Sequence, residues 1–302
     1  MAIATQAYTT YTAIGQREDL IDVITTISPV DTWFTSNSGT SRATGRYHEW
    51  QRDALAAAAS NTVIEGDEFT ATAIVPTTRE GNYCQILRKS FRISDTEDMV
   101  NKAGRDTETA YQTEMKLKEL ARDIEYALVI NASSASGATG TARQLKGVLG
   151  WIATNVTTGS ATGTETLTEA MLNDNLQLVW AAGGKPSNIL CGGFVKRTIS
   201  GFSTNTRNVA ADAKSLTSAV DIYESDFGRL AVRLHHEINT TAAGTLVVLG
   251  DMSHWRKAWL RPVKREVLAR TGASTPYMIE AELTLESRSE AGHGKITQLA
   301  TS

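Results

Sequence analysis

The stretch that decides the fold is residues 94–131, SDTEDMVNKAGRDTETAYQTEMKLKELARDIEYALVIN, which contains no proline and no strand-like alternation. It opens with Ser94-Asp95-Thr96-Glu97, a capping-box pattern in which the Ser94 hydroxyl and the Glu97 carboxylate each accept a hydrogen bond from an otherwise unpaired backbone N–H. Because an α-helix rises about 1.5 Å per residue, a continuous helix here would be about 50 Å long. Such a helix spans a whole domain.

The apolar side chains of this predicted helix form a narrow stripe that is concentrated in its second half. They are Ala110, Leu117, Leu120, Ala121, Ile124 and Leu128. The other faces are polar and carry two carboxylate-first pairs four residues apart, Asp98 with Lys102 and Glu114 with Lys118. The helix is therefore expected to pack along one edge only, which favours a flat or extended molecule.

Composition places the chain among globular proteins and excludes several function classes. Its 302 residues suffice for one large domain or two ordinary ones, and 41% are hydrophobic. A net charge of -3 gives no general basic field for nucleic acid. Cys84 and Cys191 lie far apart and match no metal or redox spacing, so we expect two reduced, buried thiols. We find neither a signal peptide nor an apolar run of about 20 residues, and predict no membrane association.

The amino-terminal region is predicted to be an extended arm. Threonine is frequent in it, and its branched side chain favours extended backbone. A short amphipathic segment at residues 18–24 interrupts the arm. Trp33 and Phe34 follow without a local core of their own, so we expect these aromatic side chains to be buried on another molecule.

Residues 47–51 and 83–93 are predicted to form a two-stranded arm with a large tip. Because an isolated ribbon is marginal in water, we expect it to lie on a neighbouring molecule, with Trp50 as a candidate interface residue. The tip carries three acidic residues, Glu65, Asp67 and Glu68. They form either a solvated turn or salt bridges to a neighbour.

After a flexible glycine- and serine-rich hinge at residues 133–140, residues 146–259 favour a compact α/β region. A helix is expected from Leu167 to Trp180, capped by Thr168 and ended by two glycines. The predicted strands cover residues 188–191, 220–223, 230–234 and 245–249. The tail, residues 278–299, is predicted to form an antiparallel hairpin with Gly292 and Gly294 near its turn.

We find no pattern typical of catalysis or of metal binding. His236-Glu237 could open a zinc-protease helix, but Thr240 stands where the second histidine is needed. His235 and His236 adjoin on a predicted strand and would point to opposite faces. The turn Gly192-Gly193 could hold an anion, although a tight strand-to-helix turn explains it as well. The sequence therefore predicts a non-enzymatic protein without cofactor or metal.

One short segment carries a cluster of cations with Glu266 as its only local counter-charge. Its members are Arg256, Lys257, Arg261, Lys264, Arg265 and Arg270. They could pair with acids of the same or a neighbouring subunit, which we favour, or face nucleic-acid phosphates without reading sequence.

The order of these parts resembles the major capsid protein of tailed double-stranded DNA bacteriophages, which has an α+β fold of the Hong Kong 97 type. The resemblance covers essentially the whole chain, but only short pieces are specific: residues 16–24 with Pro29 and Thr32, 259–272, 281–286 and 291–296. It implies six parts. They are an N-terminal arm (1–45), an extended loop (46–93), a spine helix (94–133), a hinge (134–145), an axial domain (146–258) and peripheral strands (259–302).

The resemblance also implies a function and its partners. Copies would assemble into pentamers and hexamers of an icosahedral shell that encloses phage double-stranded DNA, with portal, scaffolding and decoration proteins as further partners. The protein would belong to the virion and assemble in the host cytoplasm. Two alternatives remain open: an encapsulin-type nanocompartment shell, and an uncharacterised α/β enzyme with its site in residues 146–258.

Overall fold

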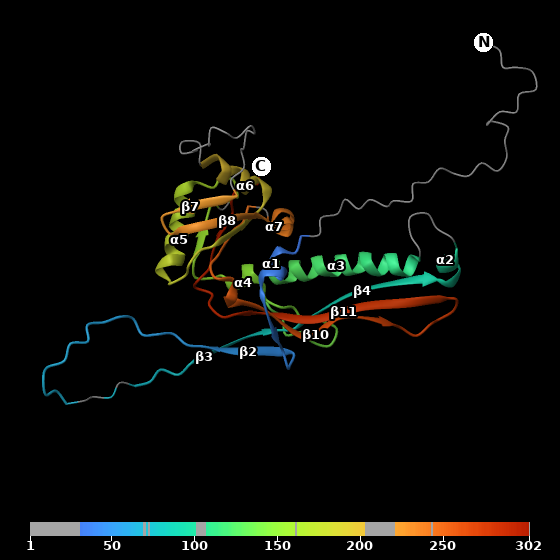
Figure 1. The fold of residues 1–302 in the computed structure, drawn as a ribbon, viewed down its shortest axis with the longest axis horizontal. Coiled ribbons are helices and arrows are strands. Elements are labelled where there is room, and N and C mark those ends of the chain that lie inside the picture. The colour runs from blue at the N-terminus through green and yellow to red at the C-terminus, as the bar shows by residue number, and fades with distance from the viewer. Residues whose placement is uncertain are drawn as a thin grey trace, which may run out of the picture.

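The structure is a computed structural model in which three groups of elements spread along one long axis (Figure 1). They are a four-stranded sheet with a long helix, a six-stranded sheet with shorter helices, and a two-stranded ribbon. The described residues are 31–68, 71, 73–100, 107–160, 162–202, 221–242 and 244–301. The amphipathic segment predicted at residues 18–24 lies outside them.

The four-stranded sheet has the order β1-β10-β11-β4. Its strands are β1 (Gly39–Arg42), β10 (Trp255–Val267), β11 (Ser274–Ser287) and β4 (Gln85–Ser94). β11 pairs antiparallel with both neighbours, while β1 runs parallel to the start of β10. The long helix α3 (Glu108–Ile130) lies along this sheet (Figure 1). Leu283, Leu285 and Leu128 are buried in the core that contains both elements.

The long helix is shorter than the sequence predicts. Ser94 accepts a hydrogen bond from the Glu97 N–H as expected, but the helix it caps, α2 (Asp95–Met99), ends before Val100, whose backbone is extended. α3 starts anew, with the Thr107 side chain accepting from the backbone N–H of Ala110. The prediction of one continuous helix from Ser94 is therefore wrong.

The six-stranded sheet has the order β5-β12-β9-β6-β8-β7. Its strands are β5 (Val156–Thr158), β12 (Gly294–Thr297), β9 (Leu246–Leu249), β6 (Asn188–Cys191), β8 (Gly228–Leu234) and β7 (Ile222–Ser225). The helices beside it are α5 (Glu169–Ala181), α6 (Gly193–Phe202) and α7 (His236–Thr241). Thr168 caps α5 and Gly183 follows it at φ +85°, which confirms both predicted ends of that helix.

The predicted hairpin at residues 278–299 is wrong because its two halves belong to different sheets. β11 stays in the four-stranded sheet, whereas β12 pairs antiparallel with β9 and parallel with β5. The chain crosses between the sheets where glycines allow close approach: a Cβ on Gly250 would lie 2.4 Å from the carbonyl oxygen of Gly292. The carboxyl-terminal part, residues 259–302, therefore contributes strands to both sheets.

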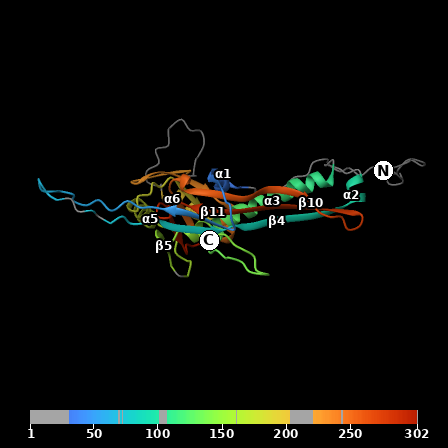
Figure 2. The same ribbon diagram turned by 90° about the horizontal axis from the view of Figure 1, so that it is seen from below.

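The ribbon consists of β2 (Tyr47–Arg52) and β3 (Thr78–Tyr83), with residues 53–77 as its loop (Figure 1). The sequence predicts residues 83–93 as the partner of β2. Tyr83 does pair with Tyr47 of β2, at the end of β3, but residues 85–93 lie in β4 and pair with β11. The predicted alternation on β4 is confirmed, since Ile93 is buried while Arg88 and Arg92 are exposed. Figure 2 shows that the ribbon extends the molecule well beyond the six-stranded sheet.

Two further segments complete the described fold. The predicted hinge at residues 133–140 folds back on itself through isolated bridges between Ala135 and Gln144 and between Ala138 and Thr141. The one-turn helix α4 (Val148–Trp151) then leads into the six-stranded half, with Val148 buried beneath α3. The short helix α1 (Trp33–Asn37) packs on the same end of α3, close to α4 (Figure 1).

Candidate assembly surfaces

Among the described residues, the loop at residues 53–77 is a long surface segment that lacks a core of its own. Its apolar side chains stand in solvent: Leu55 is 100%, Ile74 94% and Ile64 83% exposed. The segment contains four acidic residues and no lysine, arginine or histidine. Gly66, at φ +87°, makes the turn that presents the acidic tip. Exposed isoleucines beside unpaired acids are typical of a protein interface and unusual in a free surface loop.

The base of the ribbon, in contrast, is anchored firmly to the same chain. The Asn82 amide group donates to the carbonyl oxygens of Lys146 and Leu285, each at 2.9 Å. Trp50 is buried with its ring 5.5 Å from the ring of Trp151, and the rings of Tyr47 and Tyr83 lie 4.6 Å apart. These contacts fix the direction of the ribbon and leave its loop projecting.

Three aromatic residues predicted at interfaces lie within this chain's own packing instead. Phe34 is fully buried in the core, edge-on to Trp255 at 6.0 Å between ring centroids. Trp33 is half-buried against the same core, and Trp50 is buried at the ribbon base. The interface prediction is thus wrong for Phe34. Elements far away in the sequence supply the core in which its side chain is buried.

The helix α1 docks on Glu125, a buried carboxylate on α3. This residue was not singled out in the sequence analysis. It accepts hydrogen bonds from the backbone N–H groups of Phe34 (2.7 Å) and Thr35 (2.8 Å) and from the Thr35 hydroxyl (2.5 Å). His235 Nε2 supplies a fourth contact at 2.9 Å. A carboxylate has about four lone-pair sites, so this group is fully satisfied although it is completely buried. Its position between Ile124 and Leu128 of the apolar stripe was the signal available in the sequence.

Lys257 on β10 holds the other end of α1. Its ammonium group donates to the carbonyl oxygens of Thr35 and Ser38, at 2.5 and 3.2 Å. Burial lowers the pKa of Lys257, and the nearby carboxylate of Glu125 opposes that shift. The anion therefore sits at the amino end of α1 and the cation at its carboxyl end, the arrangement that its peptide dipoles favour.

Most of the predicted basic cluster is paired inside the chain, as the favoured interpretation holds. Arg261 lies 2.5 Å from Glu280 and 2.9 Å from Glu282, and Lys264 lies 2.9 Å from Glu266. The remaining contacts join Arg270 to Asp95, and Arg265 to the Thr113 hydroxyl and the face of Tyr277. Arg256 aligns with Gly39 on β1. These cations already have neighbours, which weakens the case for phosphate binding by this segment.

Two other cations are more open. Arg88 and Arg92 are exposed on β4, and no ion-pair partner is found for either among the described residues. Lys89, between them in sequence, reaches Asp123 and Glu119 on α3. Because side chains alternate along a strand, Arg88 and Arg92 must point to the face of the sheet opposite α3. That face also carries Glu280, which stands in register with Arg88 and pairs with Arg261, so the two arginines add positive charge to a face of mixed sign.

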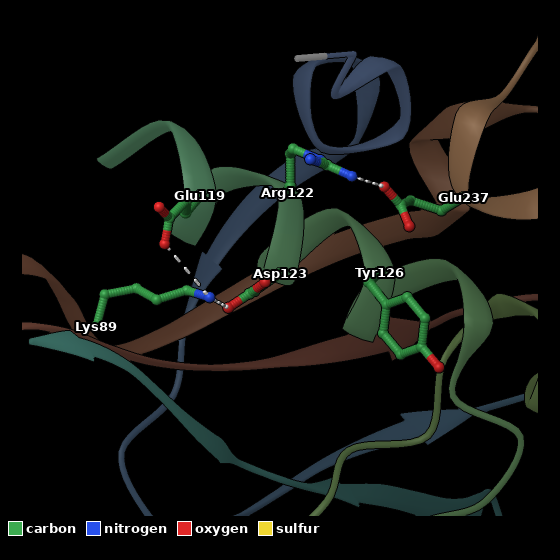
Figure 3. Close-up of a pocket in the computed structure, with 6 residues that line it drawn as sticks. All are labelled: Lys89, Glu119, Arg122, Asp123, Tyr126 and Glu237. Atoms are coloured by element: carbon green, nitrogen blue, oxygen red, sulfur yellow. Dashed lines mark hydrogen bonds and ion pairs between the residues drawn. The ribbon is translucent and has the colours of Figure 1, made fainter. Parts of the chain in front are cut away.

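A polar pocket of about 260 Å³ lies beside α3 (Figure 3). It is lined by Lys89, Glu119, Arg122, Asp123, Tyr126 and Glu237. Its charges are paired, with 2.7 Å from Lys89 to Asp123 and 3.3 Å from Arg122 to Glu237. Figure 3 shows the Tyr126 ring turned away from both pairs. Paired charges of this kind suit a polar contact with another protein.

The α/β half has an apolar patch of its own. Trp180 at the end of α5 is 60% exposed, and its ring lies 6.1 Å from that of Phe227. The turn at Gly192-Gly193 is already occupied by the same chain, because the Asn239 side chain accepts from the Gly193 N–H at 2.8 Å. The patch is a second surface suited to a protein partner.

The histidines and cysteines serve packing. His235 caps α7 by accepting from the Ile238 N–H, so the strand predicted at His235-His236 is wrong. Both cysteines are free and buried as predicted, and burial raises the pKa of Cys84 to about 11 and that of Cys191 to about 12. Among the described residues, no three His, Cys, Asp or Glu side chains form a possible metal site, and no helix is long and apolar enough to cross a membrane.

Comparison with known proteins places this architecture in a family. A family model described as the SU10 major capsid protein matches residues 4–300. The chain belongs to the SU10 major capsid protein family. The major capsid protein of Escherichia phage Phieco32 is 29% identical over 234 residues, which are 76% of this chain. The matched part spans 62% of that relative's length.

Solved structures show that this family member has the Hong Kong 97-type capsid fold. The capsid of a native GTA particle matches with a TM-score of 0.65 at 12% identity, covering 99% of both chains. The holo-SrpI encapsulin complex from Synechococcus elongatus matches with a TM-score of 0.64 at 10% identity, covering 95% of this chain and 94% of that one. At such identities the likeness establishes the α+β fold alone.

Proposed function

We propose that this chain is the structural unit of an icosahedral phage capsid, in which copies form the pentamers and hexamers of a shell around double-stranded DNA. Family membership supports this role. The observation that carries it is the loop at residues 53–77, whose isoleucine, valine and leucine side chains have nothing to pack on within the described chain. Burying a side chain of this size stabilises by about 1.5–3 kcal/mol, so several such residues provide a strong drive toward contact with another copy.

The acidic tip and the open face of the four-stranded sheet are complementary. Glu65, Asp67 and Glu68 carry negative charge on the loop, while Arg88 and Arg92 offer positive charge on the sheet. A contact between two different patches of the same molecule is heterologous and closes into rings when the rotation between copies permits. We therefore propose that the loop of one copy docks on the sheet of the next.

The remaining partners follow from the same role. Portal, scaffolding and decoration proteins would contact the shell, and packaged DNA would be contacted without sequence readout by cations that are not already paired. The protein would assemble in the host cytoplasm and remain in the virion. The role requires no catalytic step and no cofactor.

Negative-stain imaging of the purified full-length chain, alone and together with candidate scaffolding protein, tests this proposal. Closed shells of uniform size are expected. A variant with residues 54–76 replaced by a short glycine-serine linker should keep a folded body, seen by circular dichroism, and form no shells. Glu114→Ala, on the exposed side of α3, serves as the matched control. Persistent monomers in every condition would overturn the proposal, and shells filled with protein cargo instead of DNA would favour the encapsulin alternative.

A further inference from the structure

The contacts around Glu125 join three parts of the chain that are remote in sequence. The carboxylate lies on α3, two of its donors lie in α1, and His235 belongs to the six-stranded half, directly before α7. His235 Nδ1 accepts from the Ile238 N–H, so the imidazole proton is on Nε2, which donates to Glu125. One carboxylate therefore holds the amino end of α1 and the start of α7 at the same time.

Other charged groups near this junction are few. Lys257 faces α1 from β10, and Arg122 on α3 pairs with Glu237 on α7 at 3.3 Å. α1 has only five residues and one fully buried side chain, Phe34, so its docking depends heavily on the polar contacts at its two ends.

We propose that Glu125 is a positioning residue that couples the docking of α1 to the joint between α3 and the six-stranded half. When that joint opens, the carboxylate loses His235 and holds α1 less firmly. When α1 leaves, α7 in turn loses support. Such linkage is reciprocal by thermodynamic necessity. The direction of the chain at residue 31, just before α1, would then depend on the angle between the four-stranded sheet with α3 and the six-stranded sheet. This inference does not rest on the proposed shell function.

The first test is amide hydrogen exchange of the full-length chain with His235→Asn. Asparagine can still cap α7, because it accepts well at helix starts, but it is too short to reach Glu125. Because a hydrogen bond to a charged group is stronger than one between neutral groups, exchange at the Phe34 and Thr35 amides should accelerate roughly tenfold or more. Lys118→Ala, on the same helix but paired only with Glu114, is the matched control. Acceleration confined to α7 would overturn the proposal.

The second test runs in the opposite direction and uses a milder variant. Thr35→Val removes the hydroxyl bond to Glu125 while keeping the shape of the side chain, and it touches neither His235 nor α7. Exchange at the Ile238 and Asn239 amides should still accelerate severalfold. In the combined variant the acceleration at Phe34 should be smaller than the product of the two single effects, because both act through one carboxylate. Multiplying effects would show independent contacts and would contradict the coupling.

Discussion

The sequences of residues 31–38 and residues 53–77 both suggest arms that need a partner. In the structure the first segment packs on its own chain, whereas the second stays exposed to solvent. The first segment buries Phe34 completely and has its two ends held by Glu125 and Lys257 of the same chain. The second leaves Leu55, Ile64 and Ile74 in solvent. Aromatic or apolar composition alone does not tell the two apart. What distinguishes them is whether distant elements of the same chain supply a core and charged partners.

The largest effect expected from this comparison is at Phe34. Phe34→Ala should lower the free energy of unfolding of the isolated chain by about 3–5 kcal/mol, because it empties a packed site beside Trp255. Ile64→Ala, the matched change on the loop, should leave that free energy within about 0.5 kcal/mol of its original value. Denaturant unfolding of the two variants at low protein concentration measures both. Equal effects would remove the distinction between the segments.

A second expectation concerns how the free energy of unfolding of the isolated chain depends on pH through His293. Burial lowers the pKa of His293 from 6.5 to about 3, and neighbouring His254 adds to the shift. Between these values the unfolded chain binds a proton that the folded chain does not, so stability falls as pH drops below 6.5. The loss should reach about 2 kcal/mol at pH 5. Denaturant unfolding at pH 7 and pH 5 measures this loss. In His293→Gln the difference in unfolding free energy between the two pH values should shrink by that amount, and an unchanged difference would contradict the interpretation.

A smaller effect on the free energy of unfolding is expected at Thr168, which caps α5 in the six-stranded half. Thr168 accepts from the Met171 N–H at 3.3 Å at the start of α5. Thr168→Ala should lower the unfolding free energy by about 1 kcal/mol, whereas Thr168→Ser should retain most of it. Thermal unfolding of the isolated chain compares the pair. Equal stability of the two variants would show that this cap contributes nothing measurable.

The smallest effect on the isolated chain should come from the acidic tip. Replacing Glu65, Asp67 and Glu68 by lysine should change its unfolding free energy by less than about 0.5 kcal/mol, since these side chains are exposed. Shell assembly, in contrast, should fail. If the tip meets the open sheet face, adding Arg88→Glu and Arg92→Glu should restore part of the assembly, as measured by light scattering. Normal assembly of the triple variant would place the tip away from any charged contact.

Local signals in the sequence predict the helix caps and the alternation of β4 correctly. Ser94, Thr168 and Gly183 act within one turn of a helix, and the strand pattern depends only on the side of the sheet. The choice of strand partner is not local. Residues 85–93 alternate as the predicted partner of β2 should, but they pair with β11, which lies far along the chain.

Non-local contacts also explain why the sequence did not predict the docking of α1 on Glu125, and why the predicted hairpin at residues 278–299 is wrong. The sequence places Glu125 beside the apolar stripe of α3, which indicates burial, but only the fold brings Thr35 and His235 to it. β12 leaves β11 for the other sheet because Gly250 and Gly292 permit a close backbone crossing. Such approaches depend on tertiary contacts that no short pattern contains.

Amide hydrogen exchange of residues 53–77, measured in the isolated chain and in the assembled shell, tests the central claim most directly. The claim is that the body folds on its own while this loop is completed only by another copy. We expect rapid, unprotected exchange in the isolated chain and at least about a hundredfold slowing in the shell, as packed interfaces produce. Strong protection already present in the isolated chain, or none in the shell, would contradict it.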